Sequence, residues 1–434
     1  MCYLFTIFAA HKQLLYMNSI EKKSFSFHLI YAIIEGCLKG CFIMNEFIFL
    51  RSMKGGTYQL GVLFQLSMLL LLLSVVFNEI LKRSSNKKRI LIWVGIVCHL
   101  PLMLTYFFPD IANPYTSGMS YQLMYMGIFF MYYMSTPLVL PTINLLLKNT
   151  YSHSNFGKFY SIASSVGRVS MLVSTFAFGA LLESDNYAFR YIYPLLAVLG
   201  IISIVCLSFI PYKSETIAIN SKGFWGSIKD SISRMVNIIK ANKAYKDFEL
   251  GFMLYGFAFL STSAVITIFL ESYLNLNYMS VAFYKNVFNV LAVVLMPFFG
   301  KILHKLDPRQ FALITFGSLG LYIFFIGLTE YFPAHFTYMG IEIYYTLMLA
   351  MVSFGVFSAS MPLLWNIGSA YFCKSKDAGD YQSIHLTLTG VRGAFAPLFG
   401  IFFYETMGFM GTWVIAIFSV IAALALMVYS YKRY

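Results

Sequence analysis

The chain has 434 residues, of which 59% are hydrophobic and only 11% are charged, and its mean hydropathy is +0.71. Soluble proteins carry about 25% charged residues, and no soluble core can hide this much apolar surface, so lipid must be the solvent for most of the chain. The composition excludes an ordinary soluble enzyme domain, and the net charge of +13 reflects the sorting of Lys and Arg to one side of a membrane rather than binding to nucleic acid.

Residues 1–24 form a leader ahead of the first long apolar run. The apolar stretch 4–10 is too short to cross a bilayer, and no clear small-residue cleavage site follows it, which argues against a cleaved signal peptide. A more ordinary polar leader, MNSIEKKS, begins at Met17. Met1 and Met17 are therefore both candidate starts of translation.

Twelve apolar runs follow along the chain, each long enough for a spanning helix, which needs about 20 predominantly apolar residues. Turn-forming pieces at 53–56, 109–114, 184–186 and 307–308 separate several of them. The sequence therefore predicts an all-α, polytopic membrane protein with twelve transmembrane helices. The runs are 25–50, 57–81, 89–108, 119–147, 156–182, 189–210, 247–273, 279–303, 310–330, 340–370, 379–404 and 409–431.

The longest loop, 211–246, contains apolar residues at helical spacing with polar residues between them. This pattern predicts an amphipathic helix that lies on the membrane surface, attracted by anionic lipid, and that connects the two halves of the chain. The apolar positions are Phe224, Ile228, Ile232, Met235, Val236 and Ile239.

The basic residues gather in alternate loops. One set of loops and both tails hold almost all of them, whereas the opposite loops hold only Arg51, Lys54 and Arg190. Because Lys and Arg are retained in the cytoplasm, we expect both termini and the 211–246 loop on the cytoplasmic side of a cell (inner) membrane.

The second half of the chain echoes the first at an offset of about 220 residues. A duplicated six-helix unit is typical of transporters that work by alternating access. The predicted domains are an N-terminal bundle at 25–210, the linker at 211–246 and a C-terminal bundle at 247–434. The matched pairs are Gly36 and Gly256, Pro141 and Pro362, Gly157 and Gly379, and Ser161 and Ser383, with Arg168 and Arg392 at corresponding depths in spans five and eleven.

This architecture resembles the major facilitator superfamily along essentially the whole chain. That family has a signature loop after spans two and eight, in which a glycine precedes an acidic group or its replacement and then basic residues. Here the copies read NEILKR at 78–83 and GKILHK at 300–305, and both lack the usual Asp. The resemblance implies a secondary transporter with a central cavity between two bundles. The Gly-Pro-Gly-Gly motif of the family's drug-export branches is missing from GRVSM at 167–171, and only a looser GAFAPLFG lies at 393–400.

Span one contains three charged residues, Glu35, Lys39 and Glu46, inside an apolar run. A charge in the middle of a bilayer needs a partner or a wet cavity. In a straight helix Lys39 and Glu46 lie within about 40° of Glu35, so the three would share one stripe facing a substrate or ion pathway. The alternative is an internal Glu35–Lys39 ion pair that only eases insertion.

Three further cations are predicted on the pathway: Arg168, Arg392 and Lys285. An arginine fork fits a carboxylate or phosphate, so Arg168 and Arg392 could hold an anion between the bundles. The alternative is that each arginine braces neighbouring helices, and that Lys285 extends outward to the interface. In the mid-membrane parts of the spans, Lys39 and these three cations stand against Glu35 and Glu46, so we hypothesise an organic anion as substrate.

Other polar and helix-breaking residues complete the candidate set. His99 and His385 could relay protons, although lone membrane histidines also bond neighbouring helices. Pro141, Pro362 and Pro397 are candidate sites of helix kinking or gating. The six cysteines are scattered, mostly inside apolar runs, and we expect them to be inert, with no metal or other cofactor.

The sequence therefore predicts a monomeric, proton-coupled secondary transporter for a small organic solute. Its expected partners are the solute, protons or another coupling ion, and the lipid bilayer, but not nucleic acid. A drug, metabolite or lipid exporter of the same fold is the alternative. A membrane-embedded enzyme is a remote alternative, because the chain has no nucleophile elbow, no HExxH motif and no intramembrane Asp pair.

Overall fold

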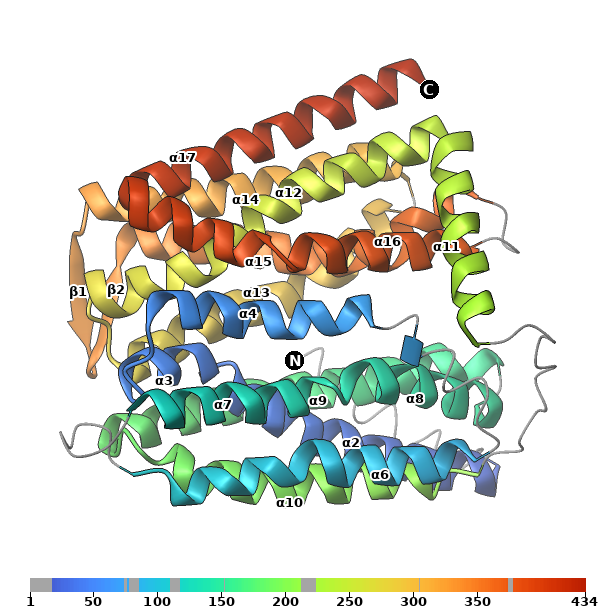
Figure 1. Cartoon of the computed structure of the whole chain (residues 1–434), viewed down its shortest axis with the longest axis horizontal. Helices are drawn as coiled ribbons and strands as arrows, with labels where there is room; N and C mark the ends of the chain where they lie inside the picture. The colour runs from blue at the N-terminus through green and yellow to red at the C-terminus, as the bar shows by residue number, and fades with distance from the viewer. Residues whose placement is uncertain are drawn as a thin grey trace.

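The computed structural model describes residues 18–73, 76–77, 86–109, 118–151, 153–211, 224–303, 305–373 and 378–434. Within these ranges the protein is almost entirely helical, and most helices run side by side along one long axis (Figure 1). The leader predicted at 1–24 lies mostly outside the described residues, and the first described helix begins at Ser19, six residues before the predicted start of span one.

Within the described residues, the first six predicted runs coincide with helices of the N-terminal half. The end of the second run and the NEILKR motif at 78–83 lie outside the described residues. Two of the runs are divided: span one breaks at 43–44 and span four at 134–135. The helices are α2 (Ser19–Phe42), α3 (Asn45–Arg51), α4 (Thr57–Leu72), α6 (Lys87–His99), η2 (Leu100–Phe107), α7 (Gly118–Tyr133), α8 (Thr136–Thr150), α9 (His153–Ser184) and α10 (Phe189–Ser208).

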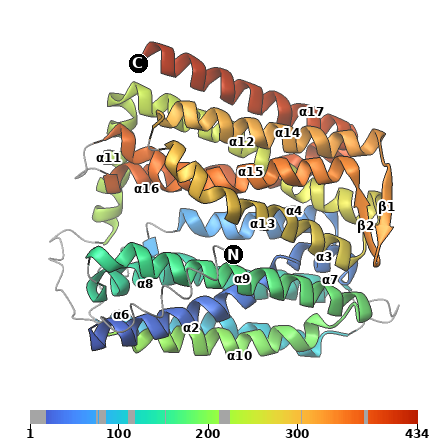
Figure 2. The ribbon, with the colours of Figure 1, turned by 180° about the vertical axis from the view of Figure 1, so that it is seen from behind.

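The C-terminal half repeats this arrangement after an amphipathic connector. The connector, α11 (Phe224–Ala241), lies across the ends of the other helices (Figures 1 and 2). The remaining helices are α12 (Lys243–Ile268), η3 (Phe269–Tyr273), α13 (Tyr278–Leu303), α14 (Pro308–Tyr331), α15 (Tyr345–Ile367), η4 (Gly368–Phe372), α16 (Ala378–Gly393) and α17 (Ala396–Arg433).

The last helix contains a turn. Gly408, inside α17, has a φ of 69°, a conformation that favours glycine, and the chain reverses there (Figure 1). The segment before Gly408 continues span eleven and the segment after it forms span twelve, as predicted. Nine helical segments among the described residues are long and apolar enough to cross a membrane, and one of them, Asp380–Arg433, contains this reversal. The architecture is consistent with twelve passes.

A β-hairpin was not predicted. β1 (His335–Tyr338) pairs antiparallel with β2 (Ile341–Tyr344), through a turn in which Met339 and Gly340 both have positive φ. Two such residues are typical of the tight turn that matches the twist of a hairpin. β2 occupies the first residues of the run predicted as span ten, so that helix begins at Tyr345 instead of residue 340.

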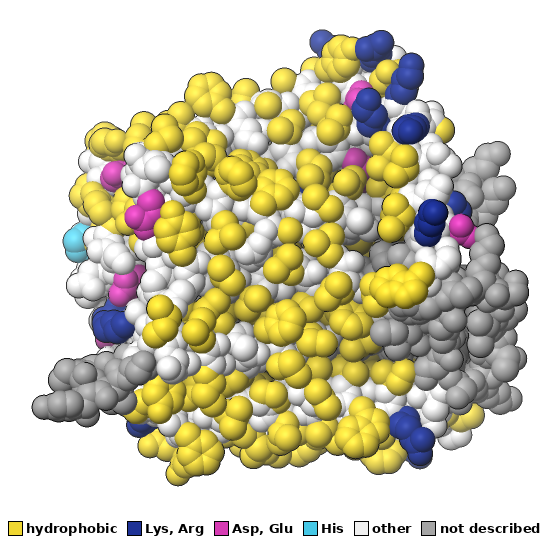
Figure 3. All heavy atoms as spheres, in the orientation of Figure 1, with side chains coloured by type: hydrophobic (Ala, Val, Ile, Leu, Met, Phe, Trp, Pro, Cys, Tyr) yellow, Lys and Arg dark blue, Asp and Glu magenta, His cyan; other side chains and the backbone are white. Residues whose placement is uncertain are grey.

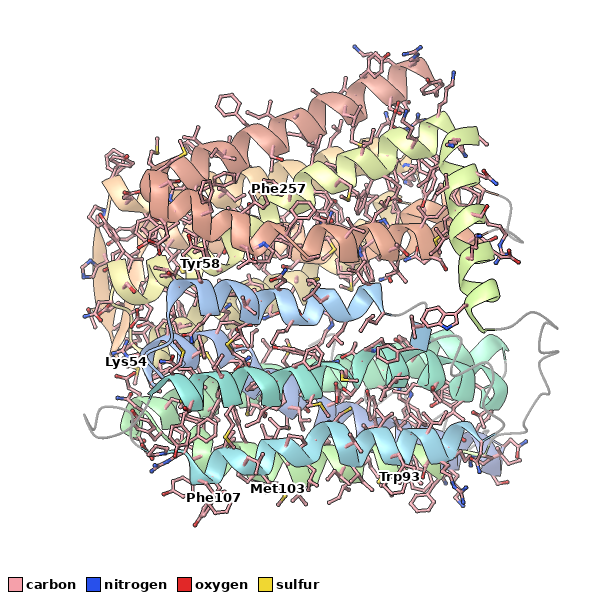
Figure 4. The ribbon with its side chains drawn as sticks, viewed as in Figure 1. Lys54, Tyr58, Trp93, Met103, Phe107 and Phe257 are labelled. Atoms are coloured by element: carbon pink, nitrogen blue, oxygen red, sulfur yellow. The ribbon has the colours of Figure 1, made fainter. Side chains whose placement is uncertain are left out.

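The hairpin marks one end of the molecule, which we call the hairpin end. The opposite end, where α2 begins, α17 ends and α11 lies, is called the terminal end (Figures 1 and 2). Between them the surface is mainly hydrophobic, while Lys and Arg gather at the ends (Figure 3). Along α6 and η2, the outward side chains of Trp93, Met103 and Phe107 are exposed (Figure 4), as expected of a lipid-facing surface.

The predicted repeat is visible in the packing of the first helix of each half against the fifth. In the N-terminal half α2 packs on α9, where a Cβ on Gly36 would lie 2.2 Å from the Gly167 carbonyl oxygen. In the C-terminal half α12 packs on α16, where a Cβ on the matching Gly256 would meet the Arg392 guanidinium at 1.9 Å. Gly36 therefore allows the backbones of α2 and α9 to approach closely, whereas Gly256 makes room for the Arg392 side chain between the equivalent helices.

The two halves meet where α9 packs on α13 and where α4 packs on α16 and α17. α9 packs on α13, where the Asn286 side chain donates a hydrogen bond to the Leu172 carbonyl at 3.0 Å. α4 packs on α16, where a Cβ on Gly393 would lie 2.2 Å from Cβ of Met68. α4, α9 and α13 therefore border the space between the halves.

The sidedness of the protein remains a prediction and can be tested with single cysteines in a variant whose native cysteines are serines. Met339 is 78% exposed at the hairpin end, and Trp225 is 75% exposed on α11 at the terminal end. We expect a membrane-impermeant thiol reagent to label Met339→Cys in intact cells, and Trp225→Cys and Tyr434→Cys only after permeabilisation. Labelling of either terminal-end cysteine in intact cells would contradict the predicted orientation.

The close approach at Gly36 predicts that Gly36→Ala destabilises the protein. The added methyl group would collide with a backbone oxygen, so whole helices must shift, at a cost of about 1–3 kcal/mol. Gly317→Ala in α14 is the matched control, because no atom lies within 4 Å of its Cβ position and helix propensity should gain up to about 1 kcal/mol. Thermal unfolding of the purified variants measures both effects. Equal melting temperatures would show that α2 and α9 can separate freely.

Candidate functional site

A cavity of about 400 Å³ lies between the two halves, and we call it the central cavity. Helices α3, α4 and α9 of the N-terminal half and α12, α13, α14 and α15 of the C-terminal half contribute to its walls. Most of the wall is apolar and aromatic, with Phe259, Phe288 and Phe354 among its residues. Such a wall, with few polar groups, is typical of small-molecule sites.

Three of the predicted pathway residues meet in the central cavity. Glu46 enters from α3, Arg168 from α9 and Lys285 from α13, so both halves contribute a cation. The opposite charges of Glu46 and Lys285 attract one another. Lys285 therefore faces the cavity rather than the lipid interface. The charged lining holds two cations and one carboxylate.

Two further cavities lie in the N-terminal half. The Glu35 cavity, of about 380 Å³, is lined by Glu35, Lys39 and His28, and it shares Arg168 and Asn289 with the central cavity. The side cavity, of about 350 Å³, also touches Glu35 and Lys39. Since His28 lies near the start of α2, the Glu35 cavity extends from the central cavity toward the terminal end.

The predicted stripe on span one is divided between these cavities. Glu35 and Lys39 form an ion pair of 3.3 Å one helical turn apart, and the side chain of Lys39 is 58% exposed against 19% for Glu35. Glu46 faces the central cavity instead. The prediction assumed one straight helix, but α2 ends at Phe42, α3 begins at Asn45, and a short turn separates them.

Contacts between the halves close the hairpin end. The backbone N–H of Tyr278 donates to a carboxylate oxygen of Glu183 at 2.9 Å, and its hydroxyl bonds the Ser52 hydroxyl. The Phe47 and Tyr278 rings meet edge to face at 5.2 Å, and Arg51 donates to the Leu276 carbonyl. The cavities therefore lie on the terminal-end side of a sealed layer.

Arg392 does not lie with Arg168. It is buried inside the C-terminal half, where it donates to the Phe252 carbonyl and lies 5.5 Å from the centre of the Tyr255 ring. Its Nε has no hydrogen-bond partner among the described residues. This position agrees with the alternative prediction, in which the arginine braces neighbouring helices.

The register of the repeat explains the difference between the two arginines. The pairs Gly157–Gly379 and Ser161–Ser383 have an offset of 222 residues, which makes Gly390 the equivalent of Arg168. Arg392 lies two residues further along, which is about 200° around a helix. The two arginines therefore point to opposite sides of the corresponding helices.

A buried acid–histidine pair in the C-terminal half was only partly predicted. Nδ1 of His385, on α16, lies 3.1 Å from both carboxylate oxygens of Glu249, on α12, and both side chains are buried. The charge of Arg392 also attracts Glu249. Sequence reasoning missed Glu249, which lies at the predicted boundary between linker and span. A carboxylate at the start of an apolar run could have drawn attention to Glu249. Its partner, His385, is 136 residues away in the sequence, so the pairing itself could not be predicted.

The remaining candidates lie in separate places. His99 is buried, its Nδ1 lies 2.9 Å from the Gly95 carbonyl of its own helix, and it touches the side cavity. Pro362 lines the central cavity within α15, and Pro141 lies in α8. Pro397 stands at the start of α17, just after the break that ends α16, and not inside a continuous helix.

Comparison with known proteins identifies the family. A family model described as Major Facilitator Superfamily matches residues 54–372. No curated protein sequence matches the chain.

Solved transporter structures share the fold at low sequence identity. A variant of the nucleoside transporter NupG has a TM-score of 0.69 and 15% identity, with 94% of this chain and 100% of that chain covered. The peptide transporter POT in complex with sulfate has a TM-score of 0.67 and 11% identity, with coverage of 95% and 94%. A bacterial homolog of the human lysosomal transporter Spinster has a TM-score of 0.59 and 12% identity, with coverage of 95% and 96%.

These structures show a common fold alone, whereas the family model covers more than half of the chain. Together with the two repeated halves and the cavity between them, the match establishes that the chain belongs to the Major Facilitator Superfamily of membrane transporters.

Proposed function

We propose that the protein is a monomeric secondary active transporter that moves a small organic solute through the central cavity by alternating access. The observation that carries the proposal is the central cavity itself, whose charged residues come from both halves of a duplicated fold. Rocking of one half against the other around such a site would expose it to each side in turn. The contacts that close the hairpin end support an inward-facing conformation if the terminal end lies in the cytoplasm, as the charge distribution predicts.

We further propose an organic anion as the substrate. Arg168 and Lys285 come from different halves, and with Glu46 they give the cavity a surplus of one positive charge. In a cavity with apolar walls this surplus attracts an anion and repels a cation. An anion held by both cations would also link the two halves during the movement.

Export of a drug, metabolite or lipid is the second candidate. The aromatic residues of the central cavity, such as Phe259 and Phe354, favour it because they offer flat apolar contacts to a hydrophobic compound. Such a transporter would prefer neutral hydrophobic solutes over small anions, so the same measurements distinguish the two functions.

The anion proposal predicts different effects for equivalent substitutions of the two arginines. Arg168→Lys keeps a charge in the cavity but loses the fork, and Lys285→Gln removes a charge, so each should weaken anion binding about tenfold or more. Arg392→Lys is the matched control and should leave anion selectivity unchanged, because Arg392 lies away from the cavity.

The measurement is the ligand-induced rise in melting temperature, with sets of anionic, neutral and cationic metabolites, followed by transport into proteoliposomes. A preference of the wild type for cations would refute the anion proposal. Unchanged anion affinity in both Arg168→Lys and Lys285→Gln would refute the assignment of the site.

We propose that Glu35 carries the coupling proton. It borders two cavities and neighbours Lys39, so protonation would release the lysine while water can reach both groups. Glu249 is the alternative carrier, but it is sealed in the C-terminal half against His385. A buried pair of this kind is better suited to holding α12 and α16 together than to exchanging a proton with water.

This proposal predicts that Glu35→Gln abolishes gradient-driven accumulation in proteoliposomes but spares solute exchange. Glu249→Gln should instead lower the melting temperature, since it disturbs the buried hydrogen bond with His385 at a cost of about 1–3 kcal/mol, and should leave coupling intact in the folded fraction. If Glu35→Gln accumulates solute normally while Glu249→Gln loses accumulation alone, the proton is carried in the C-terminal half.

A further inference from the structure

A basic pocket lies at the terminal end, away from the central cavity, and we call it the corner pocket. It is a hollow of about 610 Å³ between the end of α11, the start of α12 and the end of α17. Lys240, Lys243, Lys246 and Arg433 line it together with one carboxylate, that of Asp247. Figure 3 shows the gathered basic side chains at the corner where α17 ends. The size is within the roughly 300–1,000 Å³ of small-molecule sites.

The electrostatics of the corner pocket favour an anion strongly. Its charged lining comprises four cations and one anion. α12 begins at Lys243 inside the pocket, and its N-terminal N–H groups add the positive end of a helix dipole. Asn242 caps this helix by accepting a hydrogen bond from the Tyr245 N–H at 3.0 Å, which fixes the position of the helix start.

Aromatic side chains hold the arginine of the pocket in place. The Arg433 guanidinium donates to the Tyr429 hydroxyl and lies 5.5 Å from the ring centres of Tyr429 and Tyr434. A guanidinium held in this way loses less entropy when it binds, and its fork matches the oxygens of a phosphate. Lysines supply further point charges around the same group.

The surroundings of the corner pocket indicate where the phosphate comes from. Leu250 lies one turn beyond Lys246 on the same face of α12, and Val428 precedes Tyr429 on α17, and both are exposed. Exposed apolar side chains next to a basic pocket at a helix end suit acyl chains below a charged headgroup. A free phosphate ion, unlike a lipid, would contact only the basic residues of the corner pocket and not these apolar side chains.

We propose that the corner pocket binds the phosphate of an anionic lipid headgroup, with the acyl chains along the outer surfaces of α12 and α17. A bound lipid would connect the end of the connector helix α11 to the first and last helices of the C-terminal half. The proposal is independent of the transported solute, because no residue of the corner pocket lines the central cavity.

The test compares lipid retention by the purified full chain, using native mass spectrometry after addition of phosphatidylglycerol or phosphatidylcholine. We expect the wild type to retain phosphatidylglycerol preferentially. The site variant Lys243→Gln/Lys246→Gln/Arg433→Gln should lose roughly 100-fold in affinity, at about fivefold for each basic residue. Lys243→Arg/Lys246→Arg should retain the lipid.

The control variant Arg89→Gln/Lys301→Gln/Lys305→Gln removes the same charges from other exposed or half-buried places at the terminal end, and it should bind like the wild type. A second arm measures competition by inorganic phosphate and glycerol phosphate. Equal loss in the site and control variants would show a general surface charge and overturn the proposal. Complete competition by inorganic phosphate at the affinity of the lipid would assign the pocket to a free oxyanion and also overturn it.

Discussion

The structure depends on one constraint: a charge that enters the bilayer must be paired or must face a cavity, because no bulk water is there to solvate it. The charged residues predicted on the pathway satisfy this constraint. Glu35 pairs with Lys39, Glu46 and Lys285 attract one another across the central cavity, and Arg392 binds a carbonyl and an aromatic ring. The same constraint indicates which residues could take part in transport, because a solute or a proton can reach only the charged groups that face a cavity.

Much of the fold could be predicted because lipid imposes a simple rule on sequence. Apolar runs of sufficient length gave the helices, and the matched glycines at Gly36 and Gly256 gave the repeat, which the packing of α2 on α9 and of α12 on α16 confirms. The break at 43–44 could not be predicted, because Ile43 and Met44 are not helix breakers. The β-hairpin was also missed, since its second strand continues directly into the apolar run of α15.

The candidate site was less predictable than the fold, because a site depends on which side of each helix faces which neighbour. The repeat gave the approximate depth of Arg168 and Arg392 in the membrane. Arg392, however, lies two residues beyond the position equivalent to Arg168, so the two side chains lie on opposite sides of the corresponding helices. The pairing of Glu249 with His385 joins helices far apart in sequence, and neither residue alone reveals the other. Substrate, direction and coupling stay proposals, since the family shares its fold among transporters of different solutes.

The seal at the hairpin end has a consequence for the medium in which the protein works. Its named contacts are hydrogen bonds to backbone groups and hydroxyls and an edge-to-face pair of rings, and none of them joins two opposite charges. At 0.1 M, dissolved salt largely screens exposed charges that are more than about 10 Å apart, but it acts weakly on short contacts of this kind. We therefore expect the contacts that close the hairpin end to depend little on the ionic strength of the medium, and in the proposed orientation that medium is the one outside the cell.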